Sequence, residues 1–326
     1  MNQKNRFRAA FALGIISLCF MTSCSKKQDT KTISILQFSL HNSLENCREG
    51  FLKGLKAAGL ENGKNLKIEY SNAENDMSNA TMLANSFASQ QPDLICTIST
   101  PATKAAFDAT ANTNLPVVFV AVSDPVKSGF VQSKEQPATN CTGTCDTFTV
   151  DKQLTLIHDL MPNAHTIGLL YTQTESNSLA QLELLRNEAL NQGFDIEAIG
   201  ITNPSEIPRA LDSLVTKCDL INNFADNTIA DNLDVILSKA NAAKIPVFGV
   251  DDEQVKQGCI AAVSINYELV GMKAGSIAAR ILKGENPKNI PVDTITETTT
   301  VANKAVLEKY GISVPDTYED NIDYIK

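Results

Sequence analysis

Asp93-Leu94-Ile95 followed by Leu115-Pro116-Val117-Val118-Phe119 recurs later in the chain as Asp219-Leu220-Ile221 followed by Ile245-Pro246-Val247-Phe248. The two halves also begin alike, with Thr32-Ile33-Ser34-Ile35-Leu36 in the first and Thr166-Ile167-Gly168-Leu169-Leu170 in the second. Because the similarity runs from an opening strand to a later one, the repeated unit is a whole lobe. The sequence therefore predicts two related lobes that face each other across a cleft.

Both halves read as strands that alternate with helices. In the first half, strands are expected at 33–38, 66–70, 94–98 and 117–122, and helices at 44–58, 77–89 and from Pro101 onward. In the second half, strands are expected at 166–171, 195–199, 220–224 and 247–250, and helices at 178–191, 204–216 and 228–243. This alternation demands parallel pairing with helical crossovers. The expected fold class is α/β, with two doubly wound parallel-sheet lobes.

A further segment follows the second repeat. It contains a strand at 260–265, a helix at 268–282, an extended Thr-rich stretch through Thr300 and a short helix at 302–310. These elements are too few for a third domain, so we expect the lobes to share them through a multi-strand hinge that opens and closes. The first lobe is then 32–148 plus about 259–288, and the second is 149–258 plus about 289–326.

The N-terminus has the order of a secretory signal. Three cations, Lys4, Arg6 and Arg8, precede an apolar run at 9–21 that is too short to span a bilayer. Thr22-Ser23-Cys24 then resembles a bacterial lipobox, which implies removal of residues 1–23 and lipidation of Cys24. Ordinary cleavage without lipid is the alternative. With lipid attached, residues 24–31 form a tether that holds the folded part outside the cytoplasm, anchored to the membrane.

Composition disfavours several classes of function. The net charge of −9 becomes −12 when the three cations leave with the signal, and this disfavours nucleic acid as a partner. The hydrophobic and charged contents, 43% and 20%, are those of a soluble globular chain. The sequence contains no G-x-S-x-G, no Gly-rich phosphate loop and no H-E-x-x-H. We therefore expect a monomeric binding protein that is not an enzyme and that uses no cofactor or metal.

Six cysteines remain after Cys19 and Cys24 are set aside: Cys47, Cys96, Cys141, Cys145, Cys218 and Cys259. Thiols in an oxidising compartment can pair. Cys141 and Cys145 flank a turn-like stretch, so a local bridge between them is one possibility. Cys47 and Cys96 lie on apolar patterns and are expected to fill core space. The pairing is left open at this point.

Polar loops follow the strands at the edge where a ligand binds in an open α/β sheet. Ser99 and Thr100 precede a helix, so their hydroxyls and the first helical amides suit a ligand carboxylate, with a plain N-cap as the alternative. Asp226-Asn227-Thr228 suits either a clasp for an ammonium group or a helix cap. Asp251 either joins that clasp or lies in a solvated turn.

Other candidates at this edge have weaker patterns. Glu175 and Asn177 precede a helix, where capping competes with contact across the cleft, and Asp124 before a proline is expected mainly to shape its loop. His41 lies in a polar loop, where surface placement is the default. Three aromatic residues, Phe119, Phe224 and Tyr267, either wall the ligand or belong to the core.

The polar loops and strand ends carry a family resemblance. The segments are Ile98-Ser99-Thr100-Pro101-Ala102, Pro116–Phe119 with Ser123–Val126, Pro162-Asn163 with Thr166–Tyr171, Glu175–Ser178, Asp226–Thr228 and Lys244–Phe248. In order and spacing they resemble the ABC transporter substrate-binding proteins that include tryptophan-, phenylalanine- and tyrosine-binding lipoproteins. The resemblance implies a type I periplasmic-binding-protein fold with three crossovers. It also implies delivery of an amino acid to an ABC permease and its ATPase.

The resemblance assigns ligand contact to Thr100, Asp226, Asn227 and Thr228, and less directly to Ser99, Asp124, Glu175, Asn177 and Asp251. The expected function is closure on an α-amino acid, with Trp, Phe or Tyr as the leading candidates. Two alternatives remain at this point: the same fold holding a branched amino acid, a purine or a sugar, and a ligand-sensing lipoprotein.

Overall fold

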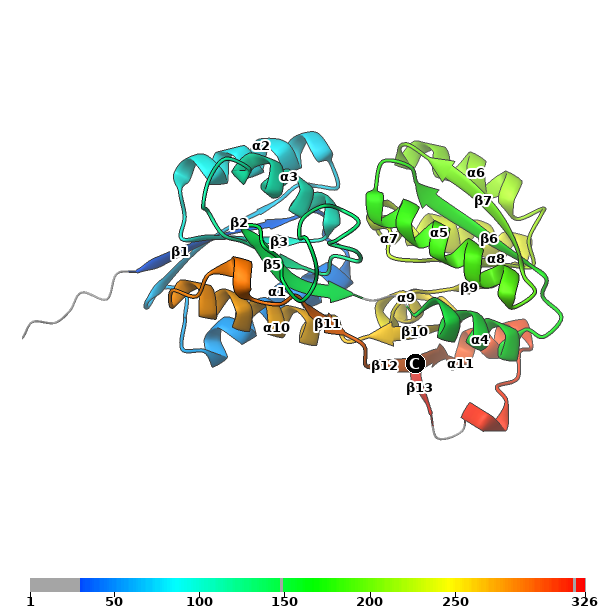
Figure 1. Cartoon of the computed structure of the whole chain (residues 1–326). Helices are drawn as coiled ribbons and strands as arrows, with labels where there is room; N and C mark the ends of the chain where they lie inside the picture. Colours follow the sequence, from blue (N-terminus) through cyan, green and yellow to red (C-terminus); the bar gives the residue numbers. More distant parts are fainter. Residues whose placement is uncertain (1–29, 147–148, 319–320, 326) are drawn as a thin grey trace, which may run out of the picture.

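The two repeats fold into two lobes, each built around a sheet with helices on both faces (Figure 1). The computed structural model describes residues 30–146, 149–318 and 321–325. The expected signal at 1–23, the lipid site at Cys24 and most of the tether lie outside these ranges. Within them, no helix combines the length and the apolar character needed to cross a membrane.

The first lobe has a six-stranded sheet in the order β11-β5-β4-β3-β1-β2, with parallel pairing throughout. Its strands are β1 (Lys31–Gln37), β2 (Leu66–Asn72), β3 (Leu94–Ile98), β4 (Val117–Val120), β5 (Cys141–Asp146) and β11 (Asp293–Ile295). Its helices are α1 (Asn42–Ala57), α2 (Met77–Gln90), α3 (Thr100–Thr110) and α10 (Tyr267–Leu282). Side chains of β1 point alternately to the two faces, so Ile33 and Ile35 pack with α1 and α10, whereas Leu36 packs with α2 and α3.

The second lobe joins two small sheets. The parallel order β7-β6-β8-β9 continues into β10-β12-β13, because Ile260 N–H donates to Val247 O at 2.7 Å. The strands are β6 (Thr166–Thr172), β7 (Asp195–Ile201), β8 (Leu220–Asn222), β9 (Val247–Phe248), β10 (Ala261–Ile265), β12 (Thr298–Asn303) and β13 (Ile322–Ile325). The helices are α4 (Val150–Leu160), α5 (Ser176–Asn191), α6 (Ile207–Leu214), α7 (Asn227–Asp231), α8 (Leu233–Ala243), α9 (Asp252–Gln257) and α11 (Lys304–Tyr310). Short 3₁₀ turns lie at Pro204–Glu206, Pro287–Asn289 and Asp316–Tyr318.

The chain passes between the lobes three times: from β5 to α4, from β10 to α10, and from β11 to β12. The segment that returns to the first lobe is 267–295, which begins and ends later than the 259–288 expected from the sequence. The difference arises because β10 pairs with β12 in the second lobe, while β11 pairs with β5 in the first. The hinge is therefore built from strand ends, as the sequence suggested.

Glycines allow α1 and α10 to pack with their backbones in contact. A methyl group added at Gly271 would lie 2.0 Å from Cys47 O, and one at Gly50 would lie 2.0 Å from Glu268 O. Gly54 and Gly275 make the same kind of approach. This contact fixes α10, which is distant in sequence, as a permanent part of the first lobe.

The six described cysteines are all buried and free. Cys47 and Cys96 lie in the core, as expected. Cys141 and Cys145 belong to β5, which the sequence analysis treated as a turn. Four residue steps along an extended strand place their Cα atoms about 13 Å apart, too far for a disulfide, so this structure corrects the suggested local bridge.

Candidate ligand-binding site

A small cavity lies between the lobes, where the strands end. Seven of the residues expected at the site line it: His41, Ser99, Thr100, Asn177, Asp226, Asn227 and Asp251. Glu175 and Thr228 lie directly behind this lining, and Asp124 lies outside it. Of the three aromatic candidates, Tyr267 lines the cavity, whereas Phe119 and Phe224 are buried in the cores.

The N-terminus of α3 forms one wall. Ser99 follows β3 with φ 88° and ψ 163°, a conformation that is essentially reserved for glycine and costs about 1–3 kcal/mol. The Ser99 side chain makes no capping bond, and its buried Oγ has no hydrogen-bond partner. Ala121, at the end of the neighbouring strand β4, also has a positive φ of 56° and lines the cavity. Strained backbone at two adjacent strand ends thus presents an unpaired hydroxyl and free helix amides to the cavity.

Asp226 braces the opposite wall. Its carboxylate accepts hydrogen bonds from Thr172 N (2.6 Å), Thr172 Oγ1 (2.8 Å), Ser178 Oγ (2.7 Å) and Ile229 N (3.0 Å). The bond from Ile229 N caps α7, which is the helix-cap alternative of the sequence analysis. Each carboxylate oxygen already accepts two hydrogen bonds from the protein, so Asp226 has no acceptor position left for the ammonium group that it was expected to bind.

Glu175 holds the beginnings of α5 and α7 together. It accepts hydrogen bonds from the backbone and side chains of Asn227 and Thr228, and from Asn177 Nδ2 at 3.0 Å. Burial, together with the nearby charge of Asp226, raises the pKa of Glu175 to about 8. Glu175 therefore acts behind the cavity, as a positioning group for Asn177 and Asn227.

Asn177 presents an unpaired oxygen to the cavity. Its amide nitrogen donates to Glu175 and, at 2.8 Å, to Ala225 O. These two bonds fix the orientation of the amide, and Oδ1, although buried, has no partner. The side chain is thus positioned to accept a hydrogen bond from a bound molecule.

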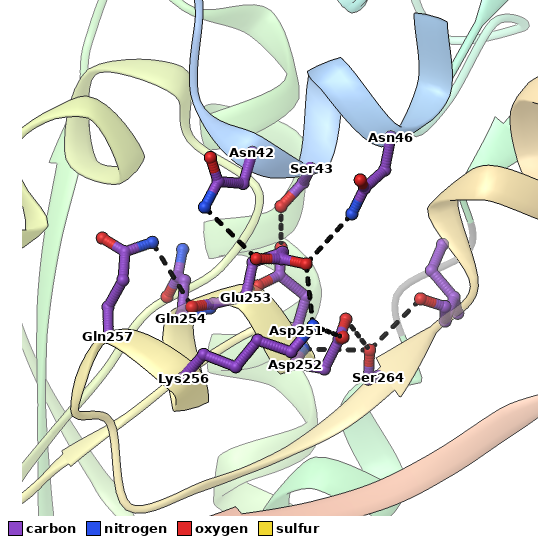
Figure 2. A network of polar contacts seen from close by, with 11 residues as sticks. Asn42, Ser43, Asn46, Asp251, Asp252, Glu253, Gln254, Lys256, Gln257 and Ser264 are labelled. Atoms are coloured by element: carbon purple, nitrogen blue, oxygen red, sulfur yellow. Dashed lines mark hydrogen bonds and ion pairs between the residues drawn. The ribbon is translucent and has the colours of Figure 1, made fainter. Parts of the chain in front are cut away.

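Hydrogen bonds between the lobes close the cavity. Ser43 Oγ donates to Asp251 Oδ2 at 2.5 Å, and Asp251 also caps α9 through Gln254 N. Figure 2 shows this contact beside Glu253, which accepts from Asn42 and Asn46 of α1. His41 Nε2 lies 3.3 Å from Asn227 Oδ1, so the loop histidine also faces the other lobe. Asp251 is thus an interlobe contact and not part of a solvated turn.

Asp124 shapes a loop. Its Oδ1 accepts from Lys127 N at 2.9 Å, three residues further along the chain. This bond fixes the turn that follows Ser123, in keeping with the structural role considered for this residue. Ser123, immediately before it, does line the cavity and was not among the expected site residues.

Asp146 is the main site residue that the sequence reasoning missed. It ends β5, is 6% exposed and lines the cavity, and its Oδ1 has no partner at hydrogen-bond geometry. Burial raises the pKa of Asp146 to about 7, and hydrogen bonds with Ser123 and Tyr267 offset this only in part. An acidic residue at the end of a buried strand was the available signal, but the strand itself was read as a turn.

A two-lobed α/β protein with a cavity between the lobes and a three-segment hinge belongs to the class of solute receptors with a type I periplasmic-binding-protein fold. The model of the ABC transporter substrate binding protein family matches residues 32–321. The chain therefore belongs to this family, whose members are extracytoplasmic binding proteins and not enzymes.

Three relatives, one curated protein and two solved structures, illustrate the similarity. A tyrosine-binding protein of Clostridioides difficile (strain R20291) is 35% identical over all of this chain and 97% of its own length. A Streptococcus pneumonia structure in complex with L-Trp is 30% identical, covers 91% of this chain and all of its own, and has a TM-score of 0.88. A ligand-free, open substrate binding protein from Clostridium difficile is 39% identical over 91% of this chain and 99% of its own.

The open relative has a TM-score of only 0.68, although its sequence identity to this chain exceeds that of the L-Trp complex. The lobe arrangement of this chain is therefore closer to the L-Trp complex than to the open structure. The interlobe hydrogen bonds of Ser43, Asn42 and Asn46 are consistent with this closed arrangement.

Proposed function

We propose that this protein closes on an aromatic α-amino acid and presents it to the permease of an ABC importer. The observation that carries the proposal is a set of buried polar atoms without partners around one cavity. Ser99 Oγ, Asn177 Oδ1 and Asp146 Oδ1 all belong to lining residues. Nine buried side-chain atoms of the described residues lack a partner, and these three meet at one cavity, where a bound molecule would complete them.

The charges of the cavity suit a zwitterion. The α3 N-terminus offers amides and a hydroxyl to a carboxylate. The other described lining residues include Asp146, Asp226 and Asp251 but no Lys or Arg, so the remaining field favours a cation. An α-amino acid carries both charges a short distance apart.

An apolar compartment adjoins the charged part. The walls formed by Ala225, Val250 and Tyr267 continue into a second, small space. It is lined also by Val263 and Ile265, and by the polar residues Asp146 and Thr149. Apolar walls with a few placed polar groups are typical of small-molecule sites. The preference for an aromatic side chain over a sugar or a purine rests on relatives named for tyrosine and solved with L-Trp, and the apolar walls of this space agree with it.

Calorimetric titration of the full chain with each of the twenty common amino acids tests the proposal. We expect saturable binding of Tyr, Trp or Phe, and much weaker binding of Asp, Lys and Gly. Absence of binding to every aromatic member would overturn the assignment of the ligand. The matching D-enantiomer is the control, because reversing the α-carbon misplaces one of the two charged ends.

We further propose that Cys24 carries the lipid and anchors the protein to the membrane. The lipobox-like Thr22-Ser23-Cys24 supports this proposal. Expression of the native chain and of Cys24→Ala in a bacterial host, followed by labelling with a clickable fatty acid, tests it. We expect label and membrane association only for the native chain, and equal labelling of both would contradict the proposal.

A further inference from the structure

Asp146 occupies a special position in the fold. It is the last residue of β5 and pairs in register with Ile295 of β11, so it lies at one crossover and beside another. Asp146 and Tyr267, which begins α10 just after the remaining crossover, line both the main cavity and the adjoining apolar space. The carboxylate therefore stands where the hinge, the polar cavity and the apolar space meet.

Among the carboxylates in and around the cavity, Asp146 differs in its hydrogen bonding. Asp226 has four donors, Glu175 has five, and Asp251 is held by Ser43 Oγ and Gln254 N. Asp146 lies beside the hydroxyls of Ser123 and Tyr267, but its buried Oδ1 has no donor at hydrogen-bond geometry within the described residues. An unpaired buried carboxylate oxygen is costly, so a strong donor is missing from this position.

Among the described residues, the groups that act on this charge at short range are neutral: the hydroxyls of Ser123 and Tyr267 and the backbone of Asp146. The lining residues include no Lys or Arg among those described, and Lys134 acts on Asp146 only through longer-range attraction. A ligand ammonium group supplies both of the missing elements, because it carries a positive charge and three donors. Ser99 Oγ and the α3 amides remain available for the carboxylate at the other end.

We propose that Asp146 is the residue that binds the ammonium group of the amino-acid ligand, in place of Asp226. This inference rests on the proposed function and specifies how its charge is recognised. The first lobe then supplies the partners of both charged ends, Asp146 and Ser99, while the second lobe adds Asn177 and closes over the ligand. Because Asp146 ends a hinge strand, the ligand charge is neutralised at the point about which the lobes move.

A comparison of two ligands on three proteins tests this assignment. The ligands are the aromatic amino acid that the full chain binds most tightly and its deamino analogue, the 3-arylpropionate, which keeps the ring and carboxylate. The proteins are the native chain, Asp146→Asn and Asp226→Asn. For the native chain we expect the amino acid to bind at least about tenfold more tightly than the analogue, since a charge-assisted hydrogen bond is lost.

In Asp146→Asn we expect the affinity for the amino acid to fall at least about tenfold and that for the analogue to change less than about threefold. The preference for the ammonium group therefore disappears. Asp226→Asn, which disturbs a brace, is expected to weaken both ligands in proportion and keep the preference.

The outcomes separate the two proposals. Retention of the full preference in Asp146→Asn overturns the role of Asp146 but leaves the proposed function standing. Equal binding of both ligands to the native chain also overturns it, and this measurement needs no variant to fold. Failure of the native chain to bind any aromatic amino acid overturns the proposed function as well.

Discussion

Asp146→Asn should stabilise the ligand-free protein, and the gain should grow with pH. Asparagine has nearly the same shape as aspartate but never carries the charge that is unpaired in the cavity. Burial raises the pKa of Asp146 from 3.8 to about 7. Between these values the unfolded chain has lost the proton while the folded protein keeps it, so rising pH favours unfolding.

The size of the effect follows from this shift. A difference of about 3 pKa units at about 1.4 kcal/mol each gives a penalty of up to about 4 kcal/mol in the native chain at about pH 8. At about pH 5 the same relation gives a penalty of only about 1.5 kcal/mol in the free energy of unfolding. Glu175 also has a raised pKa, but it is present in both proteins and cancels in their difference.

Urea denaturation of the native chain and Asp146→Asn at about pH 5 and about pH 8 measures the difference. We expect the advantage of the variant to increase by about 2–3 kcal/mol between the two pH values. A pH-independent difference would refute the reasoning, because it would mean that Asp146 is equally ionised in both states. Asp124→Asn, outside the cavity lining, is the control for the same chemical substitution.

Three further outcomes are expected. Gly271→Ala places a methyl group 2.0 Å from Cys47 O and should lower the free energy of unfolding, measured with heat or urea, by at least about 1–3 kcal/mol. An unchanged melting temperature would contradict the backbone contact between α1 and α10. Ser43→Ala removes the interlobe hydrogen bond to Asp251 and should shift the ligand-free protein toward an open arrangement of the lobes. X-ray scattering should then give a larger radius of gyration than for the native chain. Identical scattering profiles would show that this hydrogen bond does not hold the lobes together. Asp226→Ala leaves Thr172 N and Ile229 N without an acceptor. We expect the free energy of unfolding to fall by about 2 kcal/mol or more and ligand binding to weaken. A variant as stable as the native chain would argue against a structural role for the Asp226 carboxylate.

Much of the fold could be predicted from the sequence because local patterns determine it. Strands such as Leu94–Ile98 are short apolar runs, and the helices between them have apolar residues at helical spacing. Because the second half repeats the same order of strands and helices, it supports the assignment of each element in the first half. Helix 228–243 is interrupted at Asn232, whose side chain donates to Thr228 O, a local competition that the periodic pattern does not reveal.

The sequence was least informative where distant segments meet. Strand β5 has the composition of a turn, with Gly143 between two threonines, and it becomes a strand because β4 and β11 pair with it on either side. Asp146 was missed with it. That the Asp226 carboxylate has all its acceptor positions filled could not be predicted either, since two of its donors, Thr172 and Ser178, lie on other segments. A polar loop shows which groups are available, and only the fold shows which remain unpaired.

The position of α10 has a consequence for how the chain is made. The first lobe needs residues 267–295 to cover α1 and to extend its sheet, yet its other strands lie before residue 147. A nascent chain emerging from the ribosome therefore cannot complete this lobe until nearly all of the polypeptide has been synthesised. Both lobes must mature together, late and post-translationally, instead of in the N-to-C order usual for multidomain chains.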